Sequence, residues 1–333
     1  MTINIKQTSY IKGINSRLEF TITGVDNTIV NSLRRIAVSC IPIYSFNNIT
    51  ISENTSIFNN NYMKLRLRNL PVIGIMADDP IYIAKDKKII IEEEITDNIM
   101  LQDNIDMDTD NKLNSSSLKQ LTMYLDFTNN MNEIVTVGTD DCKFYHIEKQ
   151  IESPYKKPLC NNIPIIKLQP KQKIKFSAIT ELGIEEESAI FSPVSIFTFK
   201  LIDNTTYDIT IESRGQLDEK KILQFTYDNM IHRLNKFLTL VQSTNNITKN
   251  ISGKILVEDA DHTLGNLISN GLTCHKKIKF AGYNMPHLLD NKILFHYEFY
   301  KEDNIIDIMK EVVDKCIDTF TNINNLIQKN IKL

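Results

Sequence analysis

Apolar and polar residues alternate over residues 17–23, and this period of two predicts a half-buried strand. From Ile29 onward the apolar residues recur at helical spacing, until Pro42 ends the pattern. Asn27 or Thr28 is placed to cap the start of this expected helix. The apolar stripe of the helix contains Ile29, Leu33, Ile36, Ala37 and Cys40.

The same order of elements occurs again later in the chain. A long amphipathic helix is expected over residues 218–241, then a strand over 254–258, a second helix, and a strand over 293–299. A long terminal helix begins near Ile305. The apolar stripes of these three helices contain Ile222, Phe225, Met230, Leu234, Phe237, Leu238 and Val241; Leu264, Leu267, Ile268 and Leu272; and Ile305, Met309, Val312, Cys316, Phe320, Ile323 and Ile327.

The chain between residues 47 and 169 has a different pattern, with short β-branched runs such as 81–83 and 89–91 separated by polar stretches. This pattern predicts an inserted, strand-rich domain with at least one exposed loop. Residues 242–252 have few large apolar side chains, which predicts a linker.

One short phrase, Asp-x-Thr-(Ile/Leu)-x-Asn, begins at Asp26 and again at Asp261. Alone, such a match is weak in a chain rich in Asn, Thr and Ile. Both copies, however, follow a predicted strand, begin an amphipathic helix and precede a long helix. Two such modules would bury their apolar stripes by packing on each other as a pseudo-symmetric pair. The matching residues are Asp26, Thr28, Ile29 and Asn31, and Asp261, Thr263, Leu264 and Asn266.

The 333-residue chain is long enough for two or three domains, and its 42% of apolar residues can bury a core. A formal net charge of -3 argues against a protein that mainly binds phosphate backbones, because such binding requires clustered Lys and Arg. No apolar run is long enough to cross a bilayer and no secretory signal is evident, so we expect a soluble, intracellular protein. The scattered cysteines predict free thiols and no metal site. They are Cys40, Cys142, Cys160, Cys274 and Cys316.

No set of catalytic residues stands out in the sequence. Nucleotide transfer requires carboxylates that converge on two metal ions, whereas the acidic runs at 78–79, 92–94 and 185–187 are contiguous and more typical of solvated surface. Cys274 and His275 could act as nucleophile and base, but neighbours at a helix end point to different faces, which favours a structural role. We therefore expect no catalytic residue, no metal and no cofactor.

Arg34 and Arg35 follow the first copy of the phrase, and from the residues alone a solvent-exposed pair is the more ordinary interpretation. The surrounding stretch, NTIVNSLRRIAVSCIP, resembles the bacterial RNA polymerase alpha subunit and its relatives, the third-largest subunit of eukaryotic RNA polymerase II and the archaeal counterpart of that subunit. Three more stretches match this family in order, beginning at Ile51, Ile166 and Tyr207.

The second half resembles the smaller partner of that subunit, the eleventh subunit of RNA polymerase II or its archaeal counterpart. The similarity lies in a His-Thr-Leu-Gly-Asn block beginning at His262 and a Phe-Ala-Gly-Tyr-x-x-Pro-His block beginning at Phe280. A fusion of the two partners is similar to the arrangement in some nucleocytoplasmic large DNA viruses.

The resemblance implies an α+β fold in which two alpha-like dimerisation modules form an intramolecular pseudo-dimer. The larger partner would comprise residues 1–46 and 170–241 around an inserted domain at 47–169, and the smaller partner residues 253–333. Members of the family often carry a cysteine cluster in the insertion; only Cys142 and Cys160 lie there, so no metal is expected. The expected pseudo-dimer core contains Ile29, Leu33, Phe237, Leu264, Leu267, Ile268 and Phe320.

The resemblance also implies a function, a non-catalytic platform on which the two largest polymerase subunits assemble in one-to-one stoichiometry, together with small subunits and with little nucleic-acid contact. Asn31, Arg34, Arg35 and Arg66 are implied to face the second-largest subunit. A viral origin implies the cytoplasm of infected cells, including viral factories, and the virion. Two alternatives remain open, a stand-alone enzyme and a homo-oligomeric interaction protein.

Overall fold

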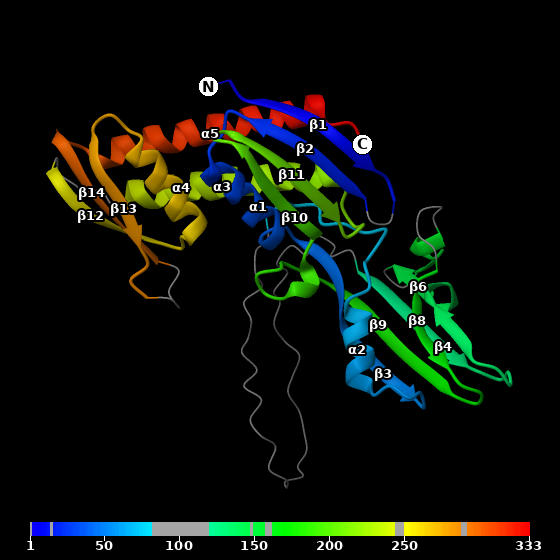
Figure 1. Cartoon of the computed structure of the whole chain (residues 1–333). Helices are drawn as coiled ribbons and strands as arrows, with labels where there is room; N and C mark the ends of the chain where they lie inside the picture. Colours follow the sequence, from blue (N-terminus) through cyan, green and yellow to red (C-terminus); the bar gives the residue numbers. More distant parts are fainter. Residues whose placement is uncertain are drawn as a thin grey trace, which may run out of the picture.

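The computed structural model describes residues 2–13, 16–81, 120–146, 149–156, 162–243, 250–287 and 292–333. Within these ranges the strands form antiparallel sheets of four, five, three and two strands, accompanied by helices (Figure 1). This architecture confirms the expected α+β fold class.

The four-stranded sheet joins segments from both ends of the first half of the chain, in the order β1-β2-β11-β10. The inward side chains of β2 are buried as the alternation predicted, whereas β1 was not expected from the sequence. The strands are β1 (Asn4–Ile11), β2 (Arg17–Thr23), β10 (Val194–Asp203) and β11 (Thr206–Ser213).

Helix α1 (Asn27–Ser39) packs against β10 and against the long helix α3 (Glu219–Ser243). The residue that caps α1 is Asp26, one position before the expected Asn27 or Thr28, because its carboxylate accepts a hydrogen bond from the Ile29 amide at 3.0 Å. The phrase therefore begins at the helix cap itself.

The second half of the chain repeats this topology. Its sheet has the order β12-β14-β13, which matches β2-β11-β10 strand for strand, with one helix after the first strand and a long helix after the last. The repeat inferred from four matching residues within six positions is therefore a repeat of a whole module. The elements are β12 (Asn250–Glu258), α4 (His262–Thr273), β13 (Ile278–Asn284), β14 (Lys292–Asp303) and α5 (Ile305–Asn330).

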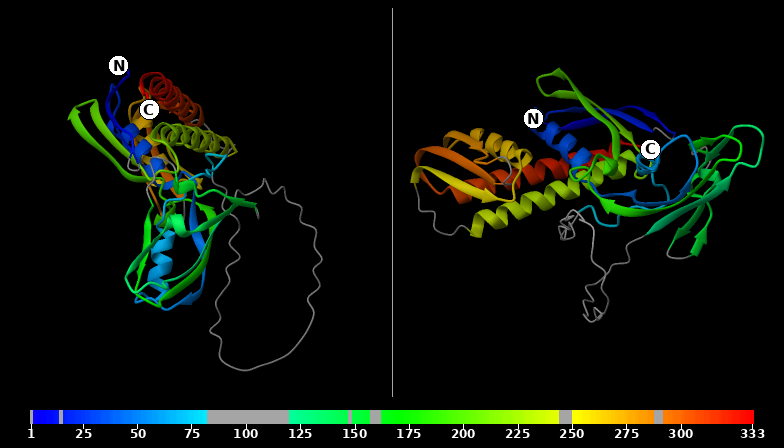
Figure 2. Two further views of the ribbon diagram at one scale, coloured as in Figure 1. Left: turned by 90° about the vertical axis from the view of Figure 1, so that its right-hand side faces the viewer. Right: turned by 90° about the horizontal axis from the view of Figure 1, so that it is seen from below.

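Helices α3 and α5 run side by side and join the two modules (Figures 1 and 2). One continuous apolar cluster extends through both modules. Across the junction, the rings of Phe237 on α3 and Phe295 on β14 meet edge to face, with centroids 5.9 Å apart. All seven residues expected in the core belong to the cluster or, for Ile29, pack against it: Ile29, Leu33, Phe237, Leu264, Leu267, Ile268 and Phe320.

The C-terminal residues of the second module lie along the edge of the first sheet. The Gln7 amide accepts a hydrogen bond from the Lys332 backbone N–H at 2.8 Å and donates one to its carbonyl at 3.1 Å. Asn330 donates to the carbonyl of Ile5 at 2.8 Å. These contacts occupy polar groups of the β1 edge that would otherwise be open to another strand.

A five-stranded sheet in the order β3-β9-β4-β6-β7 and a two-stranded sheet of β5 and β8 make a separate apolar core. Strand β9 pairs with β3 and β4 here, although its residues were expected in the dimerisation module. Helix α2 (Asn60–Arg68) was not expected in this strand-rich domain. The strands are β3 (Ile43–Asn54), β4 (Leu121–Thr128), β5 (Val135–Gly138), β6 (Lys143–His146), β7 (Lys149–Ile151), β8 (Pro164–Leu168) and β9 (Lys173–Gly183), and the short 3-10 helices are Thr139–Asp141, Pro154–Lys156 and Ala189–Phe191.

Some expectations fall on parts of the chain outside the described residues. These are the run at 81–83, apart from Ile81, the run at 89–91, the acidic run at 92–94, Cys160 and the middle of the expected linker. The linker's ends belong to regular elements, since α3 continues to Ser243 and β12 begins at Asn250. None of the helices among the described residues combines the length and the apolar composition needed to span a membrane.

Gly271 on α4 lets this helix approach α5 closely, because a Cβ at that position would overlap Cγ1 of Val312. Alanine is the better helix former by about 1 kcal/mol, but overpacking against a β-branched side chain costs about 1–3 kcal/mol. We therefore expect Gly271→Ala to lower the midpoint of chemical unfolding. Gly282→Ala is the matched control, because its new Cβ would meet the Phe280 ring at an ordinary 3.4 Å; equal stability of the two variants would contradict this packing.

Candidate functional site

The two copies of the phrase meet where α1 and α4 pack against each other. Each begins with an aspartate that caps its own helix in the same way. Oδ1 of Asp26 accepts from the Ile29 amide at 3.0 Å, and Oδ1 of Asp261 accepts from the Leu264 amide at 3.0 Å. In both cases one carboxylate oxygen satisfies the helix terminus, which leaves the other oxygen for a second partner.

The second oxygen of each capping aspartate binds the other module. Oδ2 of Asp26 accepts a hydrogen bond from the side-chain amide of Asn270 on α4 at 2.8 Å. Oδ2 of Asp261 accepts from Nη1 of Arg233 on α3 at 3.0 Å. The shared aspartate therefore both starts a helix and links the modules.

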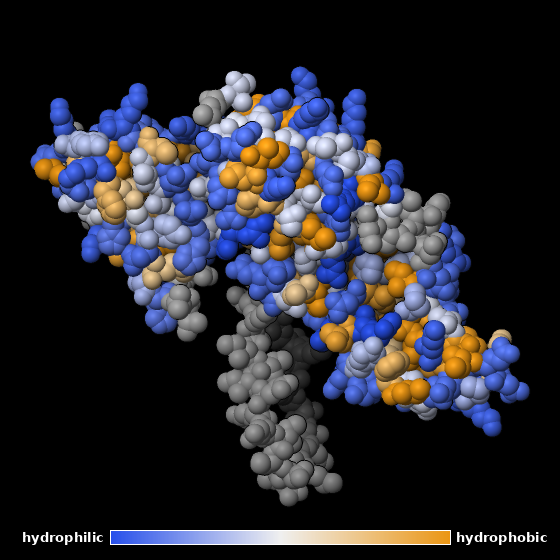
Figure 3. Space-filling view, viewed as in Figure 1, coloured by the Kyte–Doolittle hydropathy of each residue, from blue (hydrophilic) through white to orange (hydrophobic). Residues whose placement is uncertain are grey.

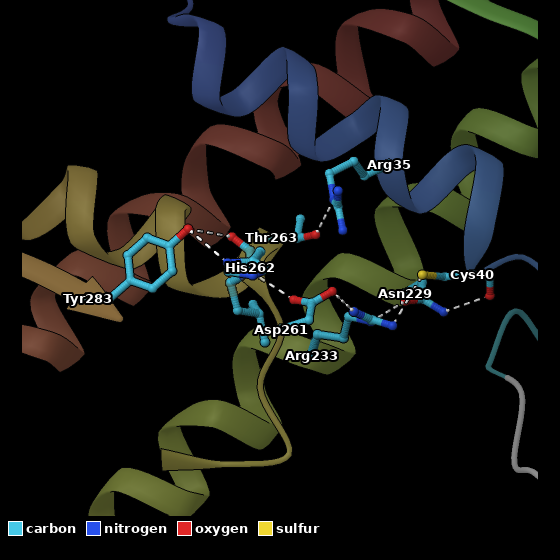
Figure 4. A network of polar contacts seen from close by, with 9 residues as sticks. Arg35, Cys40, Asn229, Arg233, Asp261, His262, Thr263 and Tyr283 are labelled. Atoms are coloured by element: carbon cyan, nitrogen blue, oxygen red, sulfur yellow. Dashed lines mark hydrogen bonds and ion pairs between the residues drawn. The ribbon is translucent and has the colours of Figure 1, made fainter. Parts of the chain in front are cut away.

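Arg35 also crosses the junction. Its Nε donates to the hydroxyl of Thr263 at 2.8 Å, and Figure 4 shows the side chain pointing from α1 toward the start of α4. We expected Arg35 to face a partner subunit; in the structure its side chain is exposed and is hydrogen-bonded to the second module. The reason is the packing of α1 on α4, which the sequence of either helix alone does not reveal.

Arg233 lies at the centre of the polar network in Figure 4. Its Nε donates to Oδ1 of Asn229 at 3.0 Å, and its Nη2 lies 3.1 Å from Sγ of Cys40. Its guanidinium therefore binds its own module on one side and Asp261 of the second module on the other. The side chains of Arg233 and Asp261 are only 25% and 34% exposed, so solvent screens this ion pair less than a surface pair.

The pKa of Asp261 lies below its ordinary value of 3.8. Burial alone would raise this pKa, but the charge of Arg233 and the hydrogen bonds from the Leu264 amide, Thr263 and Arg233 outweigh burial. A carboxyl whose folded pKa is depressed stabilises the fold fully above its unfolded pKa. That stabilisation is lost as the pH falls through the folded pKa.

Asp261→Asn should therefore be less stable than the wild type near neutral pH, and the difference should shrink in acid. Asparagine can still cap α4, so the substitution mainly removes the charge that pairs with Arg233. We expect the difference in free energy of unfolding, measured by urea titration from about pH 6 down to about pH 3, to stay constant down to about pH 5 and to decrease below it. A difference that does not change with pH would show that the charge of Asp261 is irrelevant.

Arg34 differs from Arg35 in its surroundings. Its Nε and Nη2 both donate to Oδ1 of Asn31, at 3.2 and 3.0 Å, so both contacts stay within α1. Asn31 also lines a polar hollow of about 140 Å³ between α1 and α4, together with its counterpart Asn266. The hydrogen bonds to Asn31 thus hold the Arg34 side chain in place, and the α1 surface that these two residues form remains partly accessible.

Arg66 belongs to a different surface, on α2. Its Nη2 donates to the Pro164 carbonyl at 3.2 Å, and its guanidinium carbon lies 6.0 Å from the centre of the Tyr62 ring. The α2 groove beside it has a volume of about 390 Å³, and its lining includes the exposed apolar side chain of Leu65. The exposed Phe58 ring stacks on Tyr62, which also lines the groove. Figure 3 shows apolar side chains gathered over this part of the molecule.

Neither Cys40 nor the candidate nucleophile Cys274 is placed beside a base in the part of the chain that the structure describes. Burial raises the pKa of the Cys40 thiol to about 11, although Arg233 acts in the opposite direction. The acid beside His275 is Glu311, whose Oε2 lies 3.2 Å from Nε2 of the ring. Nδ1 of His275 accepts a hydrogen bond from the backbone N–H of Lys277 at 3.4 Å. Both ring nitrogens are therefore engaged away from Cys274. Among the described residues, no group of His, Cys, Asp and Glu could hold a metal ion.

Sequence reasoning missed Arg233 and Asn270. Neither is marked by a motif, because Arg233 sits on the polar side of an amphipathic helix and Asn270 is one of many asparagines. A signal was available for Asn270, since it stands nine positions after Asp261, as Arg35 stands nine positions after Asp26.

Comparison with known proteins relates both modules to one family. The family described as the RNA polymerase Rpb3/Rpb11 dimerisation domain matches residues 19–234, and a second family of the same description matches residues 252–325. The first match alone covers more than half of the chain. The expected relationship to fused alpha-like polymerase subunits is thereby confirmed.

Individual relatives agree with this assignment. The chain is 24% identical to the putative DNA directed RNA polymerase subunit R470 of Acanthamoeba polyphaga mimivirus, over 94% of this chain and 90% of that protein. It is 27% identical to the DNA-directed RNA polymerases I and III subunit rpac1 of Dictyostelium discoideum, over 62% of this chain and 55% of that one.

The second half has relatives of its own. It is 28% identical to the probable DNA-directed RNA polymerases I and III subunit RPAC2 of Caenorhabditis elegans, over 23% of this chain and 53% of that protein. The chain thus spans about half the length of each of the two cellular relatives and most of the viral one. With two matching modules packed around one core, the chain belongs to the family of RNA polymerase Rpb3/Rpb11 dimerisation domain proteins.

Proposed function

We propose that this protein is a non-catalytic assembly subunit of a multisubunit DNA-directed RNA polymerase, in which the two alpha-like partners are fused and pair as an intramolecular pseudo-dimer. The observation that carries the proposal is that two modules of equal topology, each matching a family with the same dimerisation-domain description, share one apolar core in a single chain. Fusion would keep the partners in one-to-one ratio and at an effective concentration on the order of millimolar.

The proposed division of the chain follows the sheets. The larger partner would contain β1, β2, α1, β10, β11 and α3, and the smaller partner residues 253–333. The inserted domain would extend from β3 to β9, further than residue 169, because β9 completes its sheet. The linker at 242–252 would be shortened by the ends of α3 and β12.

Two surfaces are proposed to face the second-largest polymerase subunit. One is the α1 surface of Asn31 and Arg34. The hydrogen bonds from Arg34 to Asn31 restrict the arginine side chain and so reduce the conformational entropy that binding would cost. The other is the α2 groove with Arg66, whose apolar rim and cationic helix suit a partner with apolar anchors and carboxylates. Arg35 is exposed next to the α1 surface, and its hydrogen bond to Thr263 also gives it a place in the junction between the modules.

The largest subunit and small subunits would complete the assembly, and contact with nucleic acid would be slight because the chain carries a net charge of -3. The similarity to a mimivirus protein supports a place in the cytoplasm of infected cells, in viral factories and in the virion.

Affinity purification of the tagged, full-length protein from its source cells tests the proposal. The platform function predicts that both large polymerase subunits co-purify with the protein in equal molar amounts. Recovery of the protein alone, as a homo-oligomer, would favour the interaction-protein alternative. Turnover of a substrate by the isolated chain would favour the enzyme alternative.

A further inference from the structure

The two modules contribute different side chains to the junction between them. Arg35 and Asn270 occupy equivalent positions, nine residues after the capping aspartates. Each contacts the start of the opposite helix, Arg35 at Thr263 and Asn270 at Asp26. This is the reciprocal contact pattern of a two-fold interface, with an arginine in one module and an asparagine in the other.

The long helices α3 and α5 also carry different residues at one equivalent position near the junction. Counted from the buried Ile222 and Ile308, most of the buried residues of α3 and α5 coincide, although the buried Phe225 matches the exposed Glu311. In this register Arg233 and Thr319 take the same position, eleven residues later. Arg233 pairs with Asp261, whereas the Thr319 hydroxyl donates to the Lys315 carbonyl of its own helix at 2.8 Å. The coinciding residues are Ile222, Leu223, Leu234, Phe237 and Val241 on α3, and Ile308, Met309, Phe320, Ile323 and Ile327 on α5.

Both arginines of the junction therefore belong to the first module, and both are directed at the start of α4 in the second. Within the part of the chain that the structure describes, the hydrogen bond that reaches Asp26 across the junction comes from the neutral amide of Asn270. If two second modules paired by the same geometry, Asp261 would meet Asn270 and Thr319 of another copy. Its partly buried carboxylate would then have no cation, and such a loss is costly.

We infer that Arg35 and Arg233 determine which modules pair, by making the second module bind the first in preference to another copy of itself. These residues do not prevent two first modules from pairing, because Asp26 of one copy could accept a hydrogen bond from an arginine of the other. In a fused chain, however, every pair of first modules leaves two second modules that can only pair without arginines. The inference rests on the proposed pseudo-dimer and identifies its specificity-determining residues.

The test uses a cysteine that reports self-pairing. Asn31 and Asn266 are equivalent positions that line one hollow between α1 and α4. When two second modules pair, position 266 of one chain faces position 266 of the other. Asn266→Cys, in a Cys160→Ser and Cys274→Ser background that removes one exposed thiol and one outside the described residues, therefore reports self-pairing of second modules as a disulfide-linked dimer.

The decisive variant exchanges the arginines for the residues at equivalent second-module positions, Arg35→Asn with Arg233→Thr. In the full-length reporter under mild oxidation, the linked dimer should increase at least about tenfold over the arginine-containing reporter, which corresponds to about 1.4 kcal/mol of specificity. Arg35→Lys with Arg233→Lys keeps both charges and should restore the low dimer yield.

Arg35→Asn alone provides a second measurement if the double variant folds poorly, because Arg35 is exposed and its replacement leaves the core intact. It should still raise the dimer yield. Unchanged yield in both asparagine-containing variants, or the same increase in the lysine variant, would overturn the inference. These measurements use the isolated chain, so a failure here is distinct from a failure of the large subunits to co-purify.

Discussion

Ile268→Asp is expected to unfold both modules together, although the substitution lies in only one. Ile268 is fully buried on α4, in the apolar cluster that also contains the core of the first module. Burying a carboxylate without a partner there should lower the free energy of unfolding by on the order of 4 kcal/mol or more. The melting temperature should fall by on the order of 10 °C.

The measurement is thermal unfolding followed by circular dichroism, together with amide hydrogen exchange of β2 in the first module. Ile268→Val is the control, with an expected loss of about 0.5–1.5 kcal/mol. Position 264 is a weaker choice for the same experiment, because Leu264 lines a hollow with Arg233 and Lys236, whose charges would partly offset a new carboxylate. Unchanged protection of β2 in Ile268→Asp would show that the two modules unfold independently.

Arg34→Glu is expected to leave the isolated chain folded and to weaken its association with the second-largest polymerase subunit. The Arg34 guanidinium forms its hydrogen bonds with Asn31, on the same helix. Reversing the charge at position 34 therefore disturbs no contact between the modules. At an interface, removing one member of a buried charge pair costs about 2–5 kcal/mol, which corresponds to a loss of affinity of about 30-fold or more. Co-expression with that subunit and quantitative pull-down measure the effect.

Arg35→Glu is the matched comparison, one residue away on the same helix. It should lower the melting temperature of the isolated chain, because it removes the hydrogen bond to Thr263 and places a carboxylate beside the start of α4, near Asp261. A normal affinity of Arg34→Glu for the second-largest subunit would refute the proposed α1 interface. Equal behaviour of the two variants would show that the arginines do not have separate roles.

Prediction from the sequence was most successful where one face of an element is buried. The alternation over 17–23 and the apolar stripes of α1, α3, α4 and α5 located these elements within a few residues, because periodic burial leaves a periodic pattern. Helix α2 was missed for the opposite reason. Only Met63 and Leu67 are buried in it, so its sequence has little periodicity to detect.

The assignment of β9 failed for a different reason. Its alternation correctly indicates a strand, but nothing in a strand's own residues states which sheet it joins. Pairing with β3 and β4 is decided by side chains that lie far from β9 along the chain, more than a hundred residues away for β3. Domain boundaries that depend on such pairing cannot be read from local pattern.

For the functional site, the sequence by itself determined the repeated phrase, the capped helices that it begins and the relationship to polymerase subunits, because caps and apolar stripes are local features. Only the tertiary structure decided which residues the arginines contact. Arg34 and Arg35 are adjacent in sequence, but successive residues on a helix point about 100° apart. The packing of α1 on α4 therefore turns Arg35 to Thr263, leaves Arg34 with Asn31, and brings in Arg233 from a helix whose sequence carries no sign of it.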